Sequence, residues 1–118
     1  ACRNNNIEIV KLLIEKGADL NIKDDDRYTA LIWACRNNNI EIVKLLIEKG
    51  ADINAKNFIG YTALIWACRN NNIEIVKLLI EKGANINDQD DDGNTALDWA
   101  NYNKNNEIIK ILENAGAK

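Results

Sequence analysis

The sequence has 118 residues, of which 47% are hydrophobic and 28% are charged, and these proportions are typical of one globular domain. The formal net charge is −3, which disfavours nucleic acid and an anionic membrane surface as partners. Histidine and methionine do not occur, so the commonest general base of enzymes and the commonest metal ligand of proteins are missing.

A period of 33 residues organises the chain. Residues 1–18 recur unchanged as residues 34–51 and 67–84, and the three cysteines, Cys2, Cys35 and Cys68, share one position of the period. Such a period predicts stacked supersecondary units that bury their apolar faces against one another. Equivalent residues of stacked units lie about 10 Å apart, beyond disulfide reach. We therefore expect three reduced, buried cysteines, which favours an intracellular (cytoplasmic) location.

The N-terminal part, residues 1–23, is expected to be a partial repeat. It begins with the tail of a helix, and an unmodified amphipathic helix containing Ile9, Val10 and Leu13 follows. Terminal units of a stack need a polar outer face, which this helix lacks. We therefore expect either a fragment of a longer array or a surface that covers this end. Self-association through the uncapped face is one way to cover it.

The full units span residues 24–56 and 57–89, and each contains two predicted helices. In the first unit the shorter helix, residues 30–37, has its small and apolar side chains on one face and Trp33 and Arg36 on the opposite face. The longer helix begins at residue 40, has apolar residues at helical spacing, and is followed by Gly50 as its left-handed stop.

Runs of three asparagines lie between the two helices of each unit. Asn38 or Asn39 is suited to cap the longer helix, and Asn38 and Asn71 are suited to a left-handed backbone conformation. We interpret these runs as caps and turn formers. The Glu and Lys residues of the longer helix are interpreted as a solvated outer face with no assigned function.

The turns before the shorter helices differ between units that are otherwise nearly identical. Gly60 and Gly93 occupy the tip position that favours a positive φ, whereas the first tip has Arg27 there. The same backbone conformation at Arg27 would cost about 1 kcal/mol, which favours a rearranged first tip.

Residues 90–118 are expected to form a C-terminal capping repeat. Where the unit before has Ile65, Cys68, Ile73 and Ile80, the last unit has polar residues, namely Asp98, Asn101, Asn106 and Glu113. Polar residues at these four positions predict an exposed end face.

Three segments carry a resemblance to a known family: residues 29–34 (Thr-Ala-Leu-Ile-Trp-Ala), residues 39–47 and residues 50–54. Together with the 33-residue period they resemble the ankyrin repeat, whose unit carries the motif T-P-L-H-x-A. The resemblance covers the whole chain. It implies an all-α solenoid of stacked helix-turn-helix units with projecting turns, and a concave surface of turn tips and inner helices that binds other proteins.

The sequence departs from the family motif at two positions. Alanine replaces the family's proline, which removes a preset φ at the first helical position. The family's histidine is replaced by Ile32, Ile65 and Asp98. The threonine of each motif therefore needs another hydrogen-bond partner.

An acidic stretch, residues 88–93, matches the opening D-x-D-x-D-G of a calcium loop. The twelfth position, where a bidentate glutamate should stand, is Trp99. We therefore expect no calcium site here or at residues 24–26, and we interpret the aspartates as helix caps and turn formers. No nucleophile, oriented base or phosphate-binding loop accompanies them, so we expect no enzymatic activity and no cofactor.

A partner-binding site is predicted on the tips and the inner helices. The central anchors are expected to be Phe58, Ile59 and Trp66, with Trp66 pointing away from the packed face. Alternatively, Phe58 folds onto a neighbouring turn, and Trp33 and Trp99 are wedged between repeats. The full predicted set is Arg27, Tyr28, Trp33, Arg36, Phe58, Ile59, Tyr61, Trp66, Arg69, Asp91, Asp92, Asn94, Trp99 and Tyr102.

The sequence thus favours a non-catalytic module that binds a protein partner. Two alternatives remain open at this point. One is a structural spacer inside a longer array, which the near-identity of the units suits. The other is an engineered or consensus-like array with no native partner.

Overall fold

The computed structural model describes residues 12, 23 and 25–117, and this part of the chain contains six helices and no strand. The helices are α2 (Ala30–Arg36), α3 (Ile40–Glu48), α4 (Ala63–Arg69), α5 (Ile73–Glu81), α6 (Ala96–Tyr102) and α7 (Asn106–Asn114). None of these helices is long and apolar enough to cross a membrane. The expectations for Cys2, the first helices and the uncapped N-terminal face concern residues outside the described ones.

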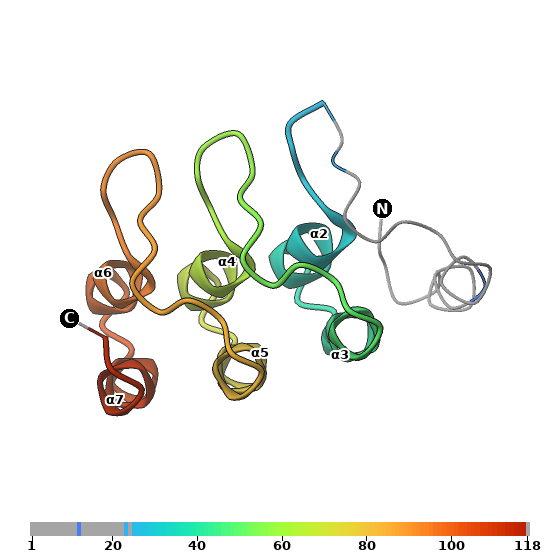
Figure 1. Cartoon of the computed structure of the whole chain (residues 1–118). Coiled ribbons are helices and arrows are strands. Elements are labelled where there is room, and N and C mark those ends of the chain that lie inside the picture. Colours follow the sequence, from blue (N-terminus) through green and yellow to red (C-terminus); the bar gives the residue numbers. More distant parts are fainter. Residues whose placement is uncertain (1–11, 13–22, 24, 118) are drawn as a thin grey trace.

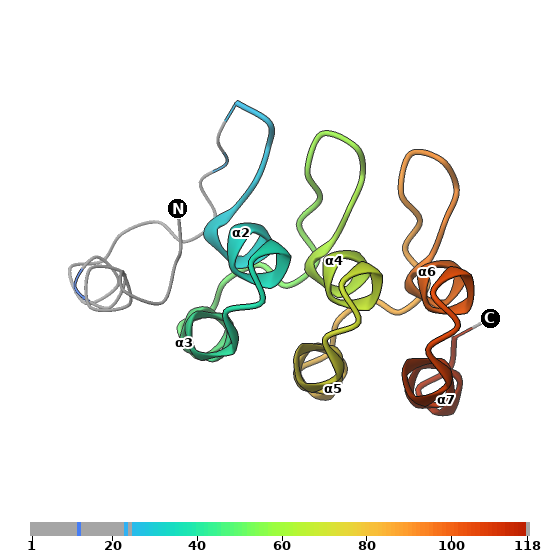
Figure 2. The same cartoon turned by 180° about the vertical axis from the view of Figure 1, so that it is seen from behind.

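The helices form two rows (Figure 1). The inner helices α2, α4 and α6 lie side by side, and the outer helices α3, α5 and α7 form the second row beneath them. The loops before the inner helices project on the side away from the outer row, as Figure 2 shows from behind. We call these loops the fingers: residues 25–29, 51–62 and 84–95. The all-α stack of helix pairs predicted from the sequence is confirmed.

Each inner helix is capped by the threonine of its motif. The side chains of Thr29 and Thr62 accept hydrogen bonds from the backbone N–H groups three residues further on. Thr95 does the same, and the carboxylate of Asp98 accepts a hydrogen bond from the backbone N–H of Thr95 to complete a capping box. The threonines therefore find their partners within the helix start, without the family's histidine.

Neighbouring asparagines of each run have different structural roles. Asn39, Asn72 and Asn105 cap the outer helices with their side-chain oxygens. Asn38 and Asn71, one residue earlier, have φ values of 59° and 60°, so the expected left-handed conformation is confirmed.

A further task of the asparagines was not predicted from the sequence. Asn70 Nδ2 donates to the backbone carbonyl of Arg36 at 3.1 Å, and Asn103 Nδ2 donates to that of Arg69 at 3.0 Å. Each bond joins one repeat to the C-terminal end of the inner helix before it. These carbonyls are otherwise left without an intrahelical partner, so the amides satisfy them and tie the repeats together.

The core runs continuously through the described repeats. Leu31, Ile42 and Leu46 of one repeat, and their equivalents in the next, are fully buried. Asp98, Asn101, Asn106 and Glu113 of the last repeat are all exposed. The Glu and Lys side chains of the outer helices, such as Glu41 and Lys44, are also exposed.

Cys35 and Cys68 are free and buried in this core, as expected. Burial raises the pKa of both thiols, that of Cys68 to about 12. The thiolate is the reactive form. We therefore expect both residues to react with iodoacetamide at pH 8 at least about a hundredfold more slowly in the folded protein than in guanidinium chloride. Peptide mapping of the labelled sites measures the two rates separately, and fast labelling of either residue in the folded state would contradict this burial.

The fingers all keep the same turn conformation at their tips. Arg27 has a φ of 63°, which lies in the same left-handed region as the φ of Gly60 at 80° and that of Gly93 at 82°. The expectation of a rearranged first tip is therefore wrong. Neighbouring fingers are joined by backbone hydrogen bonds, from Phe58 N to the carbonyl of Asp26 at 2.9 Å and from Asp91 N to that of Ile59 at 3.0 Å. These contacts between fingers hold the turn in place even where the residue is not glycine.

Candidate functional site

Aromatic and arginine side chains alternate along the inner helices. The guanidinium carbon of Arg36 lies 4.8 Å from the centre of the Trp33 ring and 5.7 Å from that of Trp66. That of Arg69 lies 5.1 Å from the Trp66 ring and 5.5 Å from the Trp99 ring. We call these five residues the Trp–Arg row. Both guanidiniums are within the range of cation–π attraction, so the row is held together by stacking as well as by the helices beneath it.

Tyrosines extend this row at its sides and at its end. Tyr28 packs on Trp33 with ring centroids 4.7 Å apart, and Tyr61 packs on Trp66 at 4.9 Å. Tyr102 stands where the first two repeats have arginine, and its ring meets Trp99 edge-on at 6.0 Å. Burial raises the pKa of the Tyr61 phenol, an effect that Arg69 opposes.

Trp66, which was predicted to point away from the packed face as a central anchor, is buried. Only 6% of Trp66 is exposed, because both arginines of the row and the rings of Tyr28 and Tyr61 surround it. Tyr28 and Tyr61 are buried too, whereas Trp33 and Trp99 are half-buried, in line with the alternative that they are wedged between repeats. A helical wheel considers one helix, and here some of the covering groups come from the fingers and from Arg36 of the preceding repeat.

The other predicted binding residues lie nearer to solvent. Phe58 is 53% exposed and Tyr102 is 79% exposed. Phe58 also lies 6.5 Å from the Tyr28 ring, so it touches the neighbouring finger and still offers half of its surface. Ile59 and Asn94 are half-buried, and the exposed charged members of the set are Arg27, Arg36, Arg69, Asp91 and Asp92.

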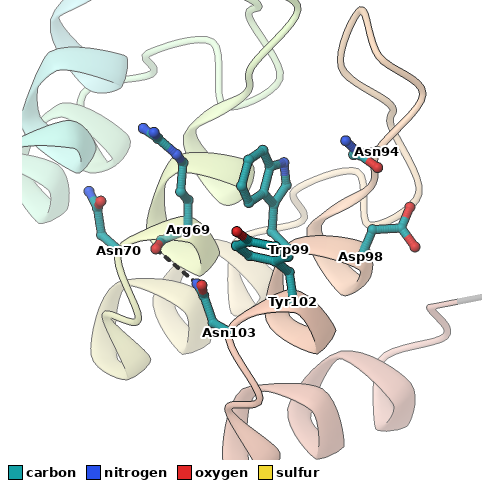
Figure 3. A pocket seen from close by; sticks show the side chains of 7 residues that line it. All are labelled: Arg69, Asn70, Asn94, Asp98, Trp99, Tyr102 and Asn103. Atoms are coloured by element: carbon teal, nitrogen blue, oxygen red, sulfur yellow. Dashed lines mark hydrogen bonds between the residues drawn. The ribbon is translucent and has the colours of Figure 1, made fainter.

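A pocket of about 760 Å³ opens beside α4 and α6 (Figure 3). Trp99 and Tyr102 stand together in it, with Arg69 on one side and Asp98 on the other. The seven lining residues are Arg69, Asn70, Asn94, Asp98, Trp99, Tyr102 and Asn103. Arg69, Asn94, Trp99 and Tyr102 belong to the predicted set, and the structure brings these four residues together at this end of the inner face.

The acidic stretch before α6 is occupied by its own turn. The Oδ1 atom of Asp90 accepts from the backbone N–H groups of Asp92 and Asn94, both at 2.9 Å, which confirms the interpretation as a turn former. Its Oδ2 atom accepts from Trp99 Nε1 at 3.2 Å. In the described part of the chain, no group of three or more acidic or cysteine side chains is placed to hold a metal ion.

In the preceding repeat the residue equivalent to Asp90 is Asn57, and here the indole N–H of the repeat has no acceptor. Asn57 Oδ1 accepts from the N–H groups of Ile59 and Tyr61, as Asp90 does in its own turn. Its Nδ2 atom, however, is a donor, and so is Trp66 Nε1. Both atoms are buried and neither has a hydrogen-bond partner among the described residues. The sequence shows the Asn-for-Asp difference, but only the structure shows that an indole N–H depends on it.

Comparison with known proteins agrees with this architecture. A family model described as ankyrin repeats (3 copies) matches residues 1–57 and again residues 55–118. No curated protein matches the sequence.

Proposed function

Because the chain belongs to the ankyrin repeat family, whose members are generally protein–protein interaction modules, we propose that it binds a protein partner on the surface formed by its fingers and inner helices. Family members are typically non-catalytic, and the proposed activity is binding without a cofactor. The partner lies along the concave side, across the central repeat and the pocket beside α6.

The observation that carries this proposal is the exposure of large aromatic residues on the inner face. Phe58 and Tyr102 are exposed by 53% and 79%; Tyr102 lines the same pocket as Arg69, and Phe58 lies against Tyr28, whose ring centre is 5.8 Å from the guanidinium carbon of Arg36. Aromatic residues and arginine are the types that contribute most to binding energy at interfaces. The outer helices present Glu and Lys instead, which are depleted at interface centres. In our proposal the buried Trp66 supports this surface from beneath, and it does not insert into the partner.

Selection of peptides from a random display library on the isolated chain tests the proposal. We expect selected peptides to lose at least about tenfold in affinity with Phe58→Ala or Tyr102→Ala, because truncating an interface aromatic costs about 2 kcal/mol. The melting temperature should stay nearly unchanged, since both side chains are exposed. Glu41→Ala and Glu74→Ala on the outer helices are the controls and should bind as well as the unmodified chain.

The same selection addresses the two alternatives. A spacer segment, or an array with no partner, would enrich no peptide sequence over several rounds. Peptides whose affinity depends on the outer-helix residues would place the binding surface on the opposite row and contradict the proposal.

A further inference from the structure

We propose that the Trp–Arg row recognises two carboxylates of an acidic segment in the partner, with one carboxylate at Arg36 and one at Arg69. This inference rests on the proposed function and specifies the chemistry of the partner. The overall charge would argue against an acidic partner, because the chain has a formal net charge of −3 and exposed acidic residues at its finger tips.

The hydrogen-bonding groups of both guanidiniums remain available. The guanidinium carbon of Arg36 lies 4.8–5.8 Å from the ring centres of Tyr28, Trp33 and Trp66, and that of Arg69 lies 5.1–5.9 Å from those of Tyr61, Trp66 and Trp99. Cation–π attraction to these rings restrains each guanidinium without using it in an ion pair. Neither side chain has a hydrogen bond or an ion pair with another described residue, and both side chains are exposed.

Two such cations, ordered before binding, match planar anions well. A carboxylate can take a bidentate pair of hydrogen bonds from each guanidinium, and these charge-assisted bonds are stronger than neutral ones. The entropy that a free arginine would lose on binding has in part been lost already, because aromatic rings hold the side chain. The two arginines therefore favour the binding of a segment that carries carboxylates over the binding of an apolar segment.

The repeat fixes the spacing of the carboxylates. Arg36 and Arg69 are equivalent residues of adjacent packed helices, whose axes lie about 8–10 Å apart. A polyproline II segment has three residues per turn and rises about 3.1 Å per residue, so acidic residues three positions apart lie on the same side about 9 Å apart and reach both arginines. The third repeat has Tyr102 at this position, which limits the acidic contact to two residues and gives the next part of the partner an aromatic surface.

A long polyanion fits this face less well than a short acidic segment. Asp25 and Asp26 lie exposed on one finger, and Asp91 and Asp92 on another. A nucleic acid that follows the two arginines would carry further phosphates past these carboxylates, and the repulsion would offset its attraction to the guanidiniums. A protein segment can place its two negative charges at the arginines and neutral or basic residues under the fingers.

The test is a nuclear magnetic resonance titration with a blocked peptide of four Gly-Ser-Glu units. We expect saturable shifts of the Arg36 and Arg69 side-chain N–H signals and of the Trp66 indole signal. Replacing every Glu of the peptide by Gln, or using the protein variant Arg36→Gln with Arg69→Gln, should weaken binding by about tenfold or more. The matched control, Lys44→Gln with Lys77→Gln, removes the same charge from equivalent positions on α3 and α5 and should bind within about twofold of the unmodified chain.

Several results would overturn the inference. These are equal binding of the Glu and Gln peptides, shifts confined to the outer helices, no shift at millimolar peptide concentration, or tighter binding of a twelve-residue oligothymidylate than of the acidic peptide. The proposed function is judged separately by the library selection. Peptides that depend on Phe58 and Tyr102 but lack acidic residues would leave that function standing and remove the role of the arginines.

Discussion

Replacing Gly60 with alanine is expected to destabilise the protein by about 3 kcal/mol, whereas the same change at Gly93 should cost about 1 kcal/mol. Both glycines have positive φ values, 80° and 82°, so both variants carry the same backbone penalty. Only at Gly60 would the new Cβ atom meet a neighbour, at 2.7 Å from Asp91 Oδ1 and 2.8 Å from Asp91 N. At Gly93 nothing lies within 4 Å.

The clash at Gly60 cannot be relieved by a side chain alone. The carboxylate of Asp91 can rotate away, but its backbone nitrogen donates the hydrogen bond that joins this finger to the next, at 3.0 Å from the carbonyl of Ile59. The alanine variant must therefore move one finger against the other and weaken that bond. Urea denaturation of the two variants measures the difference, with Gly93→Ala as the matched control. Equal losses of stability in both variants would mean that the fingers move apart freely, and that their contact contributes little.

Local sequence signals predict the repeat framework well, for physical reasons. The helix spacing and the threonine and asparagine caps act within one helix or one turn, and the 33-residue period repeats them along the chain. The intrinsic preference of asparagine predicts a left-handed conformation at positions 38 and 71, and φ values near 60° confirm this prediction.

Contacts between repeats are the part that local signals cannot predict. The cost of a positive φ at Arg27 favours a rearranged tip, yet the bond from Phe58 to the carbonyl of Asp26 ties that finger to its neighbour. A helical wheel places Trp66 opposite the packed face, and the wheel does not show that residues of the adjacent repeat cover it there. The Trp–Arg row likewise joins side chains that are one repeat apart in the sequence. The stacking of units places each arginine between two tryptophans, and the sequence of a single unit does not show how units stack.

A second large effect is expected where the central repeat has an amide instead of a carboxylate. Asn57→Asp should stabilise the protein by about 1 kcal/mol at pH 7, because a buried donor without a partner costs about 1–3 kcal/mol. The change would replace the unpaired Nδ2 atom of Asn57 by an oxygen that accepts from Trp66 Nε1, as Asp90 accepts from Trp99 Nε1 at 3.2 Å. The other side-chain oxygen would keep its bonds to the backbone N–H groups of Ile59 and Tyr61.

The new charge at position 57 would be buried, which opposes the gain. Arg36 and Arg69 lie 5.7 Å and 5.1 Å from the Trp66 ring, and their positive charges offset that cost in part. The reciprocal change, Asp90→Asn, is the control and should destabilise the protein, since it leaves the Trp99 indole without its acceptor. Urea midpoints of both variants, together with hydrogen exchange of the two indole N–H groups, give the measurement. We expect exchange at Trp66 to slow in Asn57→Asp and exchange at Trp99 to quicken in Asp90→Asn. A lower midpoint for Asn57→Asp with unchanged exchange at Trp66 would show that no bond to the indole forms and that the buried charge dominates.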